Sequence, residues 1–351
     1  MVCVDSRATW SRALTVCEAI QKRKDLKLQL VLMGPASYEP TPASLGPDVE
    51  VRISRPAGRS MAWLTGQYID CLGYNIEHDQ PDIVVSVTDR YESLAVAAAA
   101  SLSGVHLAHI QGGEVSGSLD ESMRHAITKL SHIHFPANQD SAQRIERMGE
   151  DPAYIFNVGC PATDLLLRVK VDDPPSHPYA LLSYNPVTTL KPGENLNHMS
   201  EILQACDHLY DLGFPLVIVG PNHDPGADEV LEAIHDDGEI CVPSMSHSDF
   251  IRLMAQARVM VGNSSAGIRE ACYFGTPVVN VGRRQQGRTA SSNVLTVNAP
   301  NWENIKDAIA IQLAHGRYPP EQPFGSGGAG ETIAELLSTM ELPPIQKRIR
   351  Y

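Results

Sequence analysis

Short apolar runs alternate with helical patterns along the N-terminal half of the chain. The apolar runs predict buried strands at Val2–Val4, Leu28–Met33, Ile83–Val87 and Val105–Ile110. The stretches between them predict helices at Ala8–Gln21, Met61–Ile76 and Tyr91–Leu102. Continuous apolar strands separated by helices are typical of parallel strands covered on both faces, and right-handed crossovers arrange such strands as a doubly wound sheet.

A proline-rich, acidic segment at 170–178 interrupts this pattern, which then restarts. Strands are expected at Tyr179–Ser183, Pro215–Val219, Ile240–Val242, Val259–Val261 and Val278–Val281, and helices at Leu196–Asp211, Asp228–Ile234, Asp249–Ala255 and Gly267–Tyr273. The sequence therefore predicts an α/β protein with two doubly wound, Rossmann-like domains that face a cleft, over 1–170 and 171–325. A helix near Glu331–Met340 follows a glycine-rich segment, and we expect 326–351 to cross back to the first domain.

Composition narrows the possible partners. The chain has 28 Lys and Arg against 41 Asp and Glu, a net charge of −13, which disfavours nucleic acid and anionic membranes as partners. Its cysteines are scattered without a CxxC spacing, as in proteins of reducing compartments. No apolar run reaches about 18 residues and the first residues lack a signal-peptide pattern, so we expect a cytoplasmic protein.

Charged residues follow two predicted strands of the first domain, at the edge where such sheets bind ligands. Asp89 and Arg90 come directly after one strand, and Asp89 has the alternative role of capping the next helix. The second cluster runs from His109 through Gly112-Gly113 and Glu114 to Asp120 and His125. We interpret it as a functional loop, with Ser118 or Asp120 as a plain helix cap the alternative.

Two clusters follow strands of the second domain. The turn Asn263-Ser264-Ser265 before a helix is suited to phosphate, and Glu270 further along suits ribose hydroxyls; a ligand-free serine cap is the alternative. Three arginines between Arg283 and Arg288 suggest a diphosphate grip in an acidic chain, with a solvated charge run as the alternative.

Metal and cofactor signatures are missing from the sequence. His106 and His109 would point to opposite faces of one strand, and His132 and His134 have no evident third ligand. The chain has no P-loop, no G-x-G-x-x-G after its first strand and no G-x-S-x-G. We therefore expect no metal and no bound cofactor.

Together these stretches resemble the UDP-N-acetylglucosamine 2-epimerase family, and specifically its hydrolysing branch, which makes free N-acetylmannosamine for sialic-acid synthesis. The resemblance spans most of the chain, through Asp89-Arg90, 109–117, Asp120, 124–129, 159–161, 185–189, 221–224, 262–270 and 275–277. It implies a two-domain fold like that of the GT-B glycosyltransferases, with UDP held mainly by the C-terminal domain. It also implies a UDP-sugar ligand and the release of UDP through a glycal-like intermediate.

The resemblance also implies roles for single residues. The proton-transfer set is Asp89 and Asp120, with Glu114 beside them. Arg7 belongs to the N-terminal nucleotide loop and Arg90 to the phosphates. The remaining contacts to the UDP-sugar are Gln111, Asn185, Asn222, Ser264, Ser265, Glu270 and Arg284.

Three positions depart from the family pattern, and each loses an ionisable group. Gln111 stands where the family often has Glu, Asn185 where it has His, and Thr9 where it has Asp. Nucleotide binding should survive these changes, whereas ordinary epimerisation is open to question. Three functions follow: a hydrolysing 2-epimerase acting on N-acetylglucosamine or a modified sugar, a GT-B-type glycosyltransferase with another acceptor, or a catalytically silent UDP-sugar-binding protein. We expect a homo-oligomer in each case.

Overall fold

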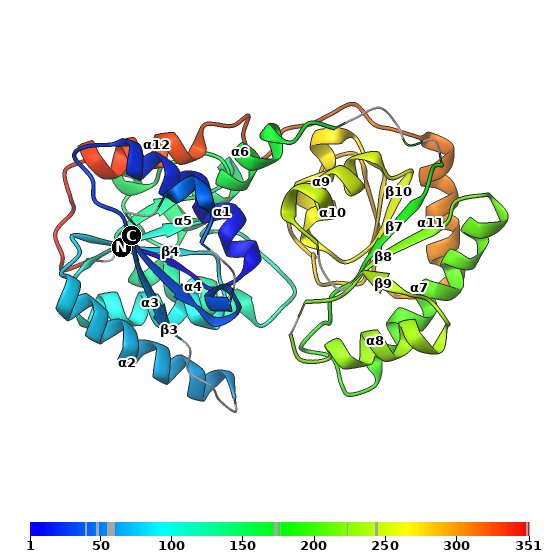
Figure 1. The fold of residues 1–351 in the computed structure, drawn as a ribbon, viewed down its shortest axis with the longest axis horizontal. Coiled ribbons are helices and arrows are strands. Elements are labelled where there is room, and N and C mark those ends of the chain that lie inside the picture. Colours follow the sequence, from blue (N-terminus) through cyan, green and yellow to red (C-terminus); the bar gives the residue numbers. More distant parts are fainter. Residues whose placement is uncertain are drawn as a thin grey trace. The chain divides into compact units, whose positions relative to one another are not determined.

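The computed structural model describes residues 1–38, 41–46, 49–54, 60–171, 175, 177–222, 224–242, 245–348 and 350, without the side chains of Arg7, Ala8 and Tyr38. These residues form two compact units (Figure 1). Unit 1 comprises Met1–Glu114, Asp120–Leu167 and Phe324–Tyr351, and unit 2 comprises Val115–Leu119 and Arg168–Pro323. The main divisions fall a few residues from the expected 170/171 and 325/326, whereas the assignment of Val115–Leu119 to unit 2 had no signal in the sequence.

Unit 1 is built on a parallel sheet of six strands. Its strands are β1 (Val2–Val4), β2 (Gln29–Met33), β3 (Glu50–Ser54), β4 (Ile83–Val87), β5 (His106–Ile110) and β6 (Ile133–Phe135). They lie in the order β3-β2-β1-β4-β5-β6, which is the Rossmann order. The chain reverses its direction of winding between β1 and β4, so the ligand crevice of this sheet is expected where these two strands end.

Helices cover both faces of this sheet (Figure 1). They are α1 (Arg7–Lys22), α2 (Met61–Asp79), α3 (Tyr91–Leu102), α4 (Asp120–Leu130), α5 (Gln139–Arg147), α6 (Pro161–Arg168) and α12 (Ala329–Thr339). One core joins alternate strand residues to α1 and α12, and a second joins the opposite residues to α2 and α3. Burial on both faces explains why these strands are continuous apolar runs.

The last helix belongs to unit 1, because α12 packs along α1. Lys22 pairs with Glu331 at 2.9 Å, and the Arg23 guanidinium donates to the Ser338 hydroxyl at 3.0 Å. Gly330 sits so close to α1 that an added Cβ would lie 2.6 Å from the carbonyl carbon of Thr15. The glycine therefore allows the two helices to approach closely.

Unit 2 repeats the architecture with a second parallel sheet. Its strands are β7 (Ala180–Ser183), β8 (Leu216–Val219), β9 (Cys241–Val242), β10 (Val259–Gly262), β11 (Val278–Val281) and β12 (Val294–Val297), in the order β12-β11-β10-β7-β8-β9. This is the same order as in unit 1, with the switch between β7 and β10. Gly262, at φ 129°, is required there because a Cβ would lie 2.1 Å from the Ser183 carbonyl oxygen.

The helices of unit 2 are α7 (Glu194–Asp211), α8 (Ala227–Asp236), α9 (His247–Gln256), α10 (Ser265–Arg269) and α11 (Trp302–His315). The buried residues of α7, α8 and α11 share one core with alternate residues of the sheet. The predicted fold class, two doubly wound Rossmann-like domains, is confirmed. No helix in the described part of the chain combines the length and hydropathy of a membrane span.

Individual elements differ from the prediction where the pattern was weak. The sequence did not indicate β3, β6 or β12, which are short or only partly buried. The predicted helix Gly267–Tyr273 is wrong in its bounds: α10 ends at Arg269, and a 3₁₀ helix continues over Ala271–Phe274. The tight 3₁₀ turn carries the chain into Gly275, which is left-handed at φ 63°.

Candidate active site

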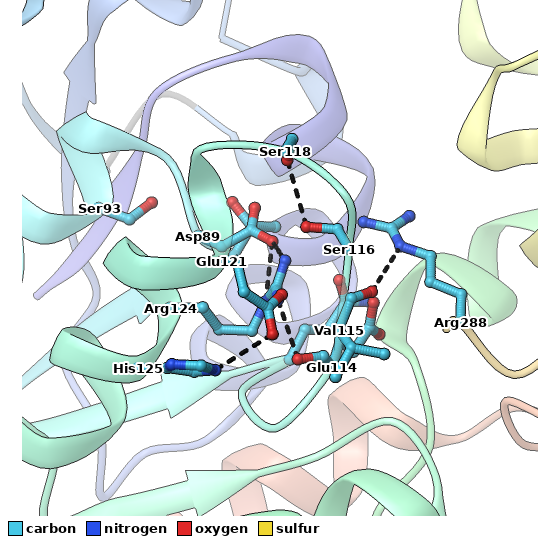
Figure 2. Close-up of polar contacts among 12 residues, drawn as sticks. Asp89, Ser93, Glu114, Val115, Ser116, Ser118, Glu121, Arg124, His125 and Arg288 are labelled. Atoms are coloured by element: carbon cyan, nitrogen blue, oxygen red, sulfur yellow. Dashed lines mark hydrogen bonds and ion pairs between the residues drawn. The ribbon is translucent and has the colours of Figure 1, made fainter. Parts of the chain in front are cut away.

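The carboxyl edge of the unit 1 sheet is organised by a buried arginine, Arg124 of α4. Its guanidinium pairs with the Asp89 carboxylate, with 3.0 Å between Nε and Oδ2 (Figure 2). The Arg124 side chain is 1% exposed and that of Asp89 is 20% exposed. Asp89 therefore has one side fixed against the protein and another that solvent or a ligand can reach.

The capping alternative for Asp89 is wrong. The N-cap residue of α3 is Arg90, not Asp89, and the Arg90 side chain makes no capping hydrogen bond. The Asp89 carboxylate instead turns to Arg124, a partner 35 positions away in the chain.

The same guanidinium organises the loop that precedes α4. It donates to the backbone carbonyl of Glu114 at 2.9 Å and pairs with the Glu121 carboxylate, which lies 3.2 Å from His125 Nε2 (Figure 2). Burial by itself would lower the pKa of Arg124, but the carboxylates around it, Asp89 first, raise it above its ordinary value. Arg124 therefore stays charged and supplies the cation for several acids at once.

Two of the three predicted acid/base residues contact Arg124, and the third precedes it on α4. Asp89 is its ion-pair partner, Glu114 provides a carbonyl, and Asp120 begins α4 one helical turn before it. Glu114 is 9% exposed, and Asp120 is partly exposed. The structure thus brings these residues to one edge of the sheet.

Backbone strain marks the same edge. Thr88 and Gln111, the residues that follow β4 and β5, have left-handed φ angles of 68° and 67°. Such a φ is rare for any residue other than glycine and is a clear outlier for a β-branched threonine. Local strain of this kind gathers at functional sites, where the surrounding structure imposes it. It is an indication of function that sequence patterns do not carry.

Arg90 and Gln111 each have a partner inside unit 1. Arg90 Nε lies 3.1 Å from an oxygen of Glu92, whose side chain is fully buried. The Gln111 side chain accepts from Arg12 Nε at 2.6 Å and donates to the Cys160 sulfur. Gln111 is only 5% exposed, and its carboxamide already has two partners. The predicted contact to a sugar would therefore involve a buried group.

Thr9, the third position that departs from the predicted family pattern, is fully buried, and its hydroxyl is hydrogen bonded. Its hydroxyl donates to the carboxylate of Asp5 at 2.5 Å, and Asp5 accepts a second bond from Ser93. A neutral hydroxyl suits this place because a second carboxylate there would repel Asp5. Arg7 begins α1, and its side chain lies outside the described residues.

His109 is a fully buried residue of β5, close to the strained turn at Thr88. Its Nε2 bonds the Thr88 carbonyl at 2.7 Å, and burial lowers its pKa to about 4. A Cβ on Gly112 would lie 2.7 Å from His109 Nδ1, which explains a glycine at that point. The imidazole is therefore neutral at physiological pH and supports the strained turn at Thr88.

In unit 2, carboxamides join the ends of three strands. The Asn263 side chain accepts from the Asn185 amide N–H at 2.7 Å and donates to the Asn185 carbonyl at 2.8 Å. The Asn185 side-chain oxygen accepts from the Asn222 amide N–H at 2.9 Å. These contacts link the loops that follow β7, β8 and β10. The Asn185 side chain therefore fixes the backbone at Asn222 through a neutral hydrogen-bond acceptor.

Ser264 and Ser265 follow β10. The Ser264 side chain accepts from the Ala266 amide N–H and caps α10, so the capping interpretation holds for it. A capping hydroxyl still has its own hydrogen to donate, so this does not decide against a ligand. Ser265 is the first residue of α10 and Glu270 is its C-cap, so the two stand at opposite ends of a five-residue helix.

The arginine segment approaches the same edge. Arg284 Nη1 donates to the Asn263 carbonyl at 3.4 Å, and the buried Gln285 side chain donates to it at 2.7 Å. Arg284, Asn263 and Asn185 are thus brought together, while Glu270 stands at the far end of α10. Asn263 is part of the turn that the sequence predicts for phosphate, but its bond to the Asn185 backbone and the bond from Gln285 to its carbonyl had no signal in the sequence.

Comparison with known proteins decides the family. The sequence model of the UDP-N-acetylglucosamine 2-epimerase family matches residues 18–338. The chain belongs to the UDP-N-acetylglucosamine 2-epimerase family. Among its relatives is the UDP-N,N'-diacetylbacillosamine 2-epimerase (hydrolyzing) of Legionella pneumophila, 32% identical over 96% of this chain and 94% of that protein. The UDP-N-acetylglucosamine 2-epimerase of Neisseria meningitidis is 29% identical over 99% and 96%.

Solved structures of other proteins have the same fold. The MnaA–UDP complex of S. aureus has a TM-score of 0.78 at 18% identity, over 96% of this chain and 95% of that one. The Neisseria meningitidis enzyme bound to UDP-GlcNAc has a TM-score of 0.78 at 16% identity, over 96% and 98%. Within the described ranges of the present chain, no group of His, Cys, Asp and Glu side chains is arranged to hold a metal ion.

Proposed function

We propose that this protein is a hydrolysing 2-epimerase that converts a UDP-2-acetamido sugar and water into UDP and the free C2-epimeric sugar. One observation carries the proposal. The carboxylates that the reaction needs gather at the strained edge of unit 1, where Arg124 holds Asp89 and follows Asp120 by one turn. The hydrolysing activity named for the Legionella relative supports the same reaction.

The reaction requires two proton transfers at C2. In the first half, a carboxylate takes the C2 proton, the C2–H electron pair forms a C1=C2 bond, and the C1–O electrons leave with UDP. In the second half, the C1=C2 electron pair takes a proton from an acid on the opposite face of C2, and a water molecule bonds to C1 through its oxygen and gives up a proton to a carboxylate. We assign these transfers to Asp89 and Asp120, with Glu114 beside them, because they reach one edge from different elements.

We assign the nucleotide to unit 2. Arg284 provides a cation beside the Asn263 carbonyl, and the hydroxyls of Ser264 and Ser265 are neighbouring donors. Asn185, Asn222 and Glu270 complete the expected contacts on this side. Charge-assisted bonds from an arginine to a diphosphate are strong, so they support UDP as the leaving group.

Two sugars are candidates for the substrate. N-acetylglucosamine is named for the Neisseria relative and N,N'-diacetylbacillosamine for the Legionella relative, which is the more identical of the two. We take UDP-N-acetylglucosamine as the first substrate to test. The second candidate is favoured by that identity.

The experiment is a turnover assay in D₂O with each UDP-sugar, following UDP, free sugar and deuterium at C2. A hydrolysing epimerase releases UDP and free sugar in equal amounts, with one deuterium at C2. Release of UDP only when an acceptor is added, with C2–H retained, would indicate a glycosyltransferase. UDP binding without any turnover of either sugar would indicate a silent binding protein. Each of the last two outcomes contradicts the proposal.

The expected homo-oligomer and cytoplasmic location stay predictions. Sedimentation of the purified protein tests the first. Fractionation of the source cells tests the second.

A further inference from the structure

A five-residue segment belongs to a different unit from its neighbours in the chain. Val115–Leu119 is part of unit 2, whereas Glu114 and Asp120, which flank it, are part of unit 1. Both flanking residues belong to the proposed acid/base set. The position of this segment therefore bears directly on where these two residues lie.

The segment is anchored to the arginine turn, residues 283–288, by backbone and side-chain bonds. The Gly117 amide N–H donates to the Arg284 carbonyl at 3.2 Å. Arg288 Nε donates to the Val115 carbonyl at 3.3 Å (Figure 2). The segment is also braced internally, by a hydrogen bond between the hydroxyls of Ser116 and Ser118.

Two glycines make this approach close. A Cβ on Gly117 would lie 2.3 Å from the Arg283 carbonyl oxygen, a backbone atom that cannot rotate away. A Cβ on Gly287 would lie 3.1 Å from a Val115 methyl carbon, and Gly287 is left-handed at φ 80°. Gly117 has no such φ, so the contact alone excludes a side chain there.

The arginine turn is itself held against the nucleotide edge. Arg284 and Gln285 both donate to the carbonyl of Asn263, the residue before Ser264. The turn is stiffened by the Gln286 amide bonding the Arg283 carbonyl and the Arg288 amide bonding the Gln285 carbonyl. A displacement of the turn at its nucleotide end would therefore carry to its other end.

We propose that Gly117 and Arg288 are positioning residues that couple UDP binding at the arginine turn to the placement of Glu114 and Asp120. This rests on the proposed function for the identity of the ligand and of the acid/base residues. Diphosphate on Arg284 fixes the turn, the turn fixes Val115–Leu119, and that segment fixes its two ends. In this arrangement, Glu114 and Asp120 are correctly placed for proton transfer only when the UDP leaving group is bound.

The main test replaces Gly117 by alanine, with Gly66→Ala as the matched control. Gly66 lies in α2 and has open space around its Cβ position. For Gly117→Ala we expect UDP affinity within about threefold of the parent and a turnover number lower by about 10–100-fold, because a shift of about 1 Å in a reacting group has effects of that order. Gly66→Ala should leave both values unchanged.

Two variants of Arg288 provide an independent test of the coupling. They are sufficient to test it if Gly117→Ala does not fold. Arg288→Ala should reduce turnover with little change in UDP affinity, and Arg288→Lys should recover part of it. Parental turnover in Gly117→Ala and Arg288→Ala would overturn the proposal. So would UDP affinity falling in parallel with turnover, which would make the segment part of the nucleotide site alone.

Hydrogen–deuterium exchange separates this proposal from the proposed function. UDP should slow exchange in peptides covering 110–124 of the parent, and this protection should be lost in Gly117→Ala. If the parent shows this protection but no hydrolysis, the proposed reaction is wrong and the coupling stands. If the parent hydrolyses its substrate and UDP leaves exchange in these peptides unchanged, the coupling is wrong and the reaction stands.

Discussion

The two sheets have one strand order and different chemistry where their strands end. In unit 1 the edge carries ion pairs, Asp89 with Arg124 and Arg90 with Glu92. In unit 2 the corresponding edge carries carboxamides, with Asn263 bridging to Asn185 and Asn185 to Asn222. The same architecture therefore supports two kinds of site, and the function follows from the residues at the edge.

The difference has a physical basis. Proton transfer needs ionisable groups, and a buried guanidinium such as Arg124 keeps neighbouring carboxylates from repelling one another. Holding a nucleotide needs fixed donors, and carboxamides that bond the backbone fix loops without a charge that varies with pH. Unit 1 should therefore govern turnover and acid sensitivity, and unit 2 should govern affinity.

The largest expected effect is on turnover, from Asp89→Asn and Asp120→Asn in unit 1. Positioned acids and bases typically contribute about 10²–10⁴-fold, so each variant should lose turnover of that order while UDP affinity is kept. Steady-state kinetics and calorimetry with UDP measure the two quantities. Asp70→Asn, on an exposed position of α2, is the control. Parental turnover in either variant would remove that residue from the acid/base set.

The second effect is an acid sensitivity of stability that originates in unit 1. The pKa of His109 is about 4 in the folded protein and about 6.5 when the chain is unfolded. As pH falls below 6.5 the unfolded chain binds a proton that the folded one does not, so the free energy of unfolding decreases. At pH 5 the expected loss from this residue is about 2 kcal/mol.

Urea unfolding at pH 7.5 and pH 5 measures this loss. His109→Gln keeps a donor for the Thr88 carbonyl without titrating in this range, so its stability should change less between the two pH values. His235→Gln, at an exposed position of α8, should behave as the parent. An equal loss in His109→Gln and the parent would show that His109 is not its source.

The third effect is on affinity, from Arg284→Ala in unit 2. Removing a hydrogen bond to a charged group costs roughly 1.5–3 kcal/mol, so UDP should bind about tenfold more weakly or worse. Glu270→Ala should weaken UDP binding as well. Arg252→Ala, at a partly exposed position of α9, is the control. Unchanged affinity in both variants, by calorimetry, would contradict the placement of UDP at this edge.

The smallest expected effect concerns Asn185. Replacing it by His removes the acceptor of the Asn222 amide N–H, at a cost of about 1–3 kcal/mol, whereas Asn185→Asp keeps an acceptor at the same place. We expect Asn185→His combined with Gln111→Glu to turn over UDP-N-acetylglucosamine more slowly than the parent. A large gain in that double variant over a nearly inactive parent would instead indicate a degenerate epimerase site.

The sequence by itself determined the fold class and which sheet edges the candidate site residues occupy. Parallel strands buried on both faces, such as β4, have to be continuous apolar runs, and polar residues directly after them have to lie at the carboxyl edge. Asp89 after β4 and Ser264 after β10 could be located in this way. Strands as short as β6, and one as exposed as β3, leave too weak a pattern.

Only the tertiary structure decided which residues pair. Several hydrogen-bonded partners are far apart in the sequence. Arg124 and Asp89 are separated by 35 positions, Asn263 and Asn185 by 78, and Arg12 and Gln111 by 99. Hydrophobic periodicity fixes which face of an element is buried, but it carries no information about a polar partner on another element. The assignment of Val115–Leu119 to unit 2 also could not be predicted from the sequence. It depends on bonds to backbone carbonyls and on the absence of a side chain at Gly117, and hydrophobic periodicity contains neither kind of information.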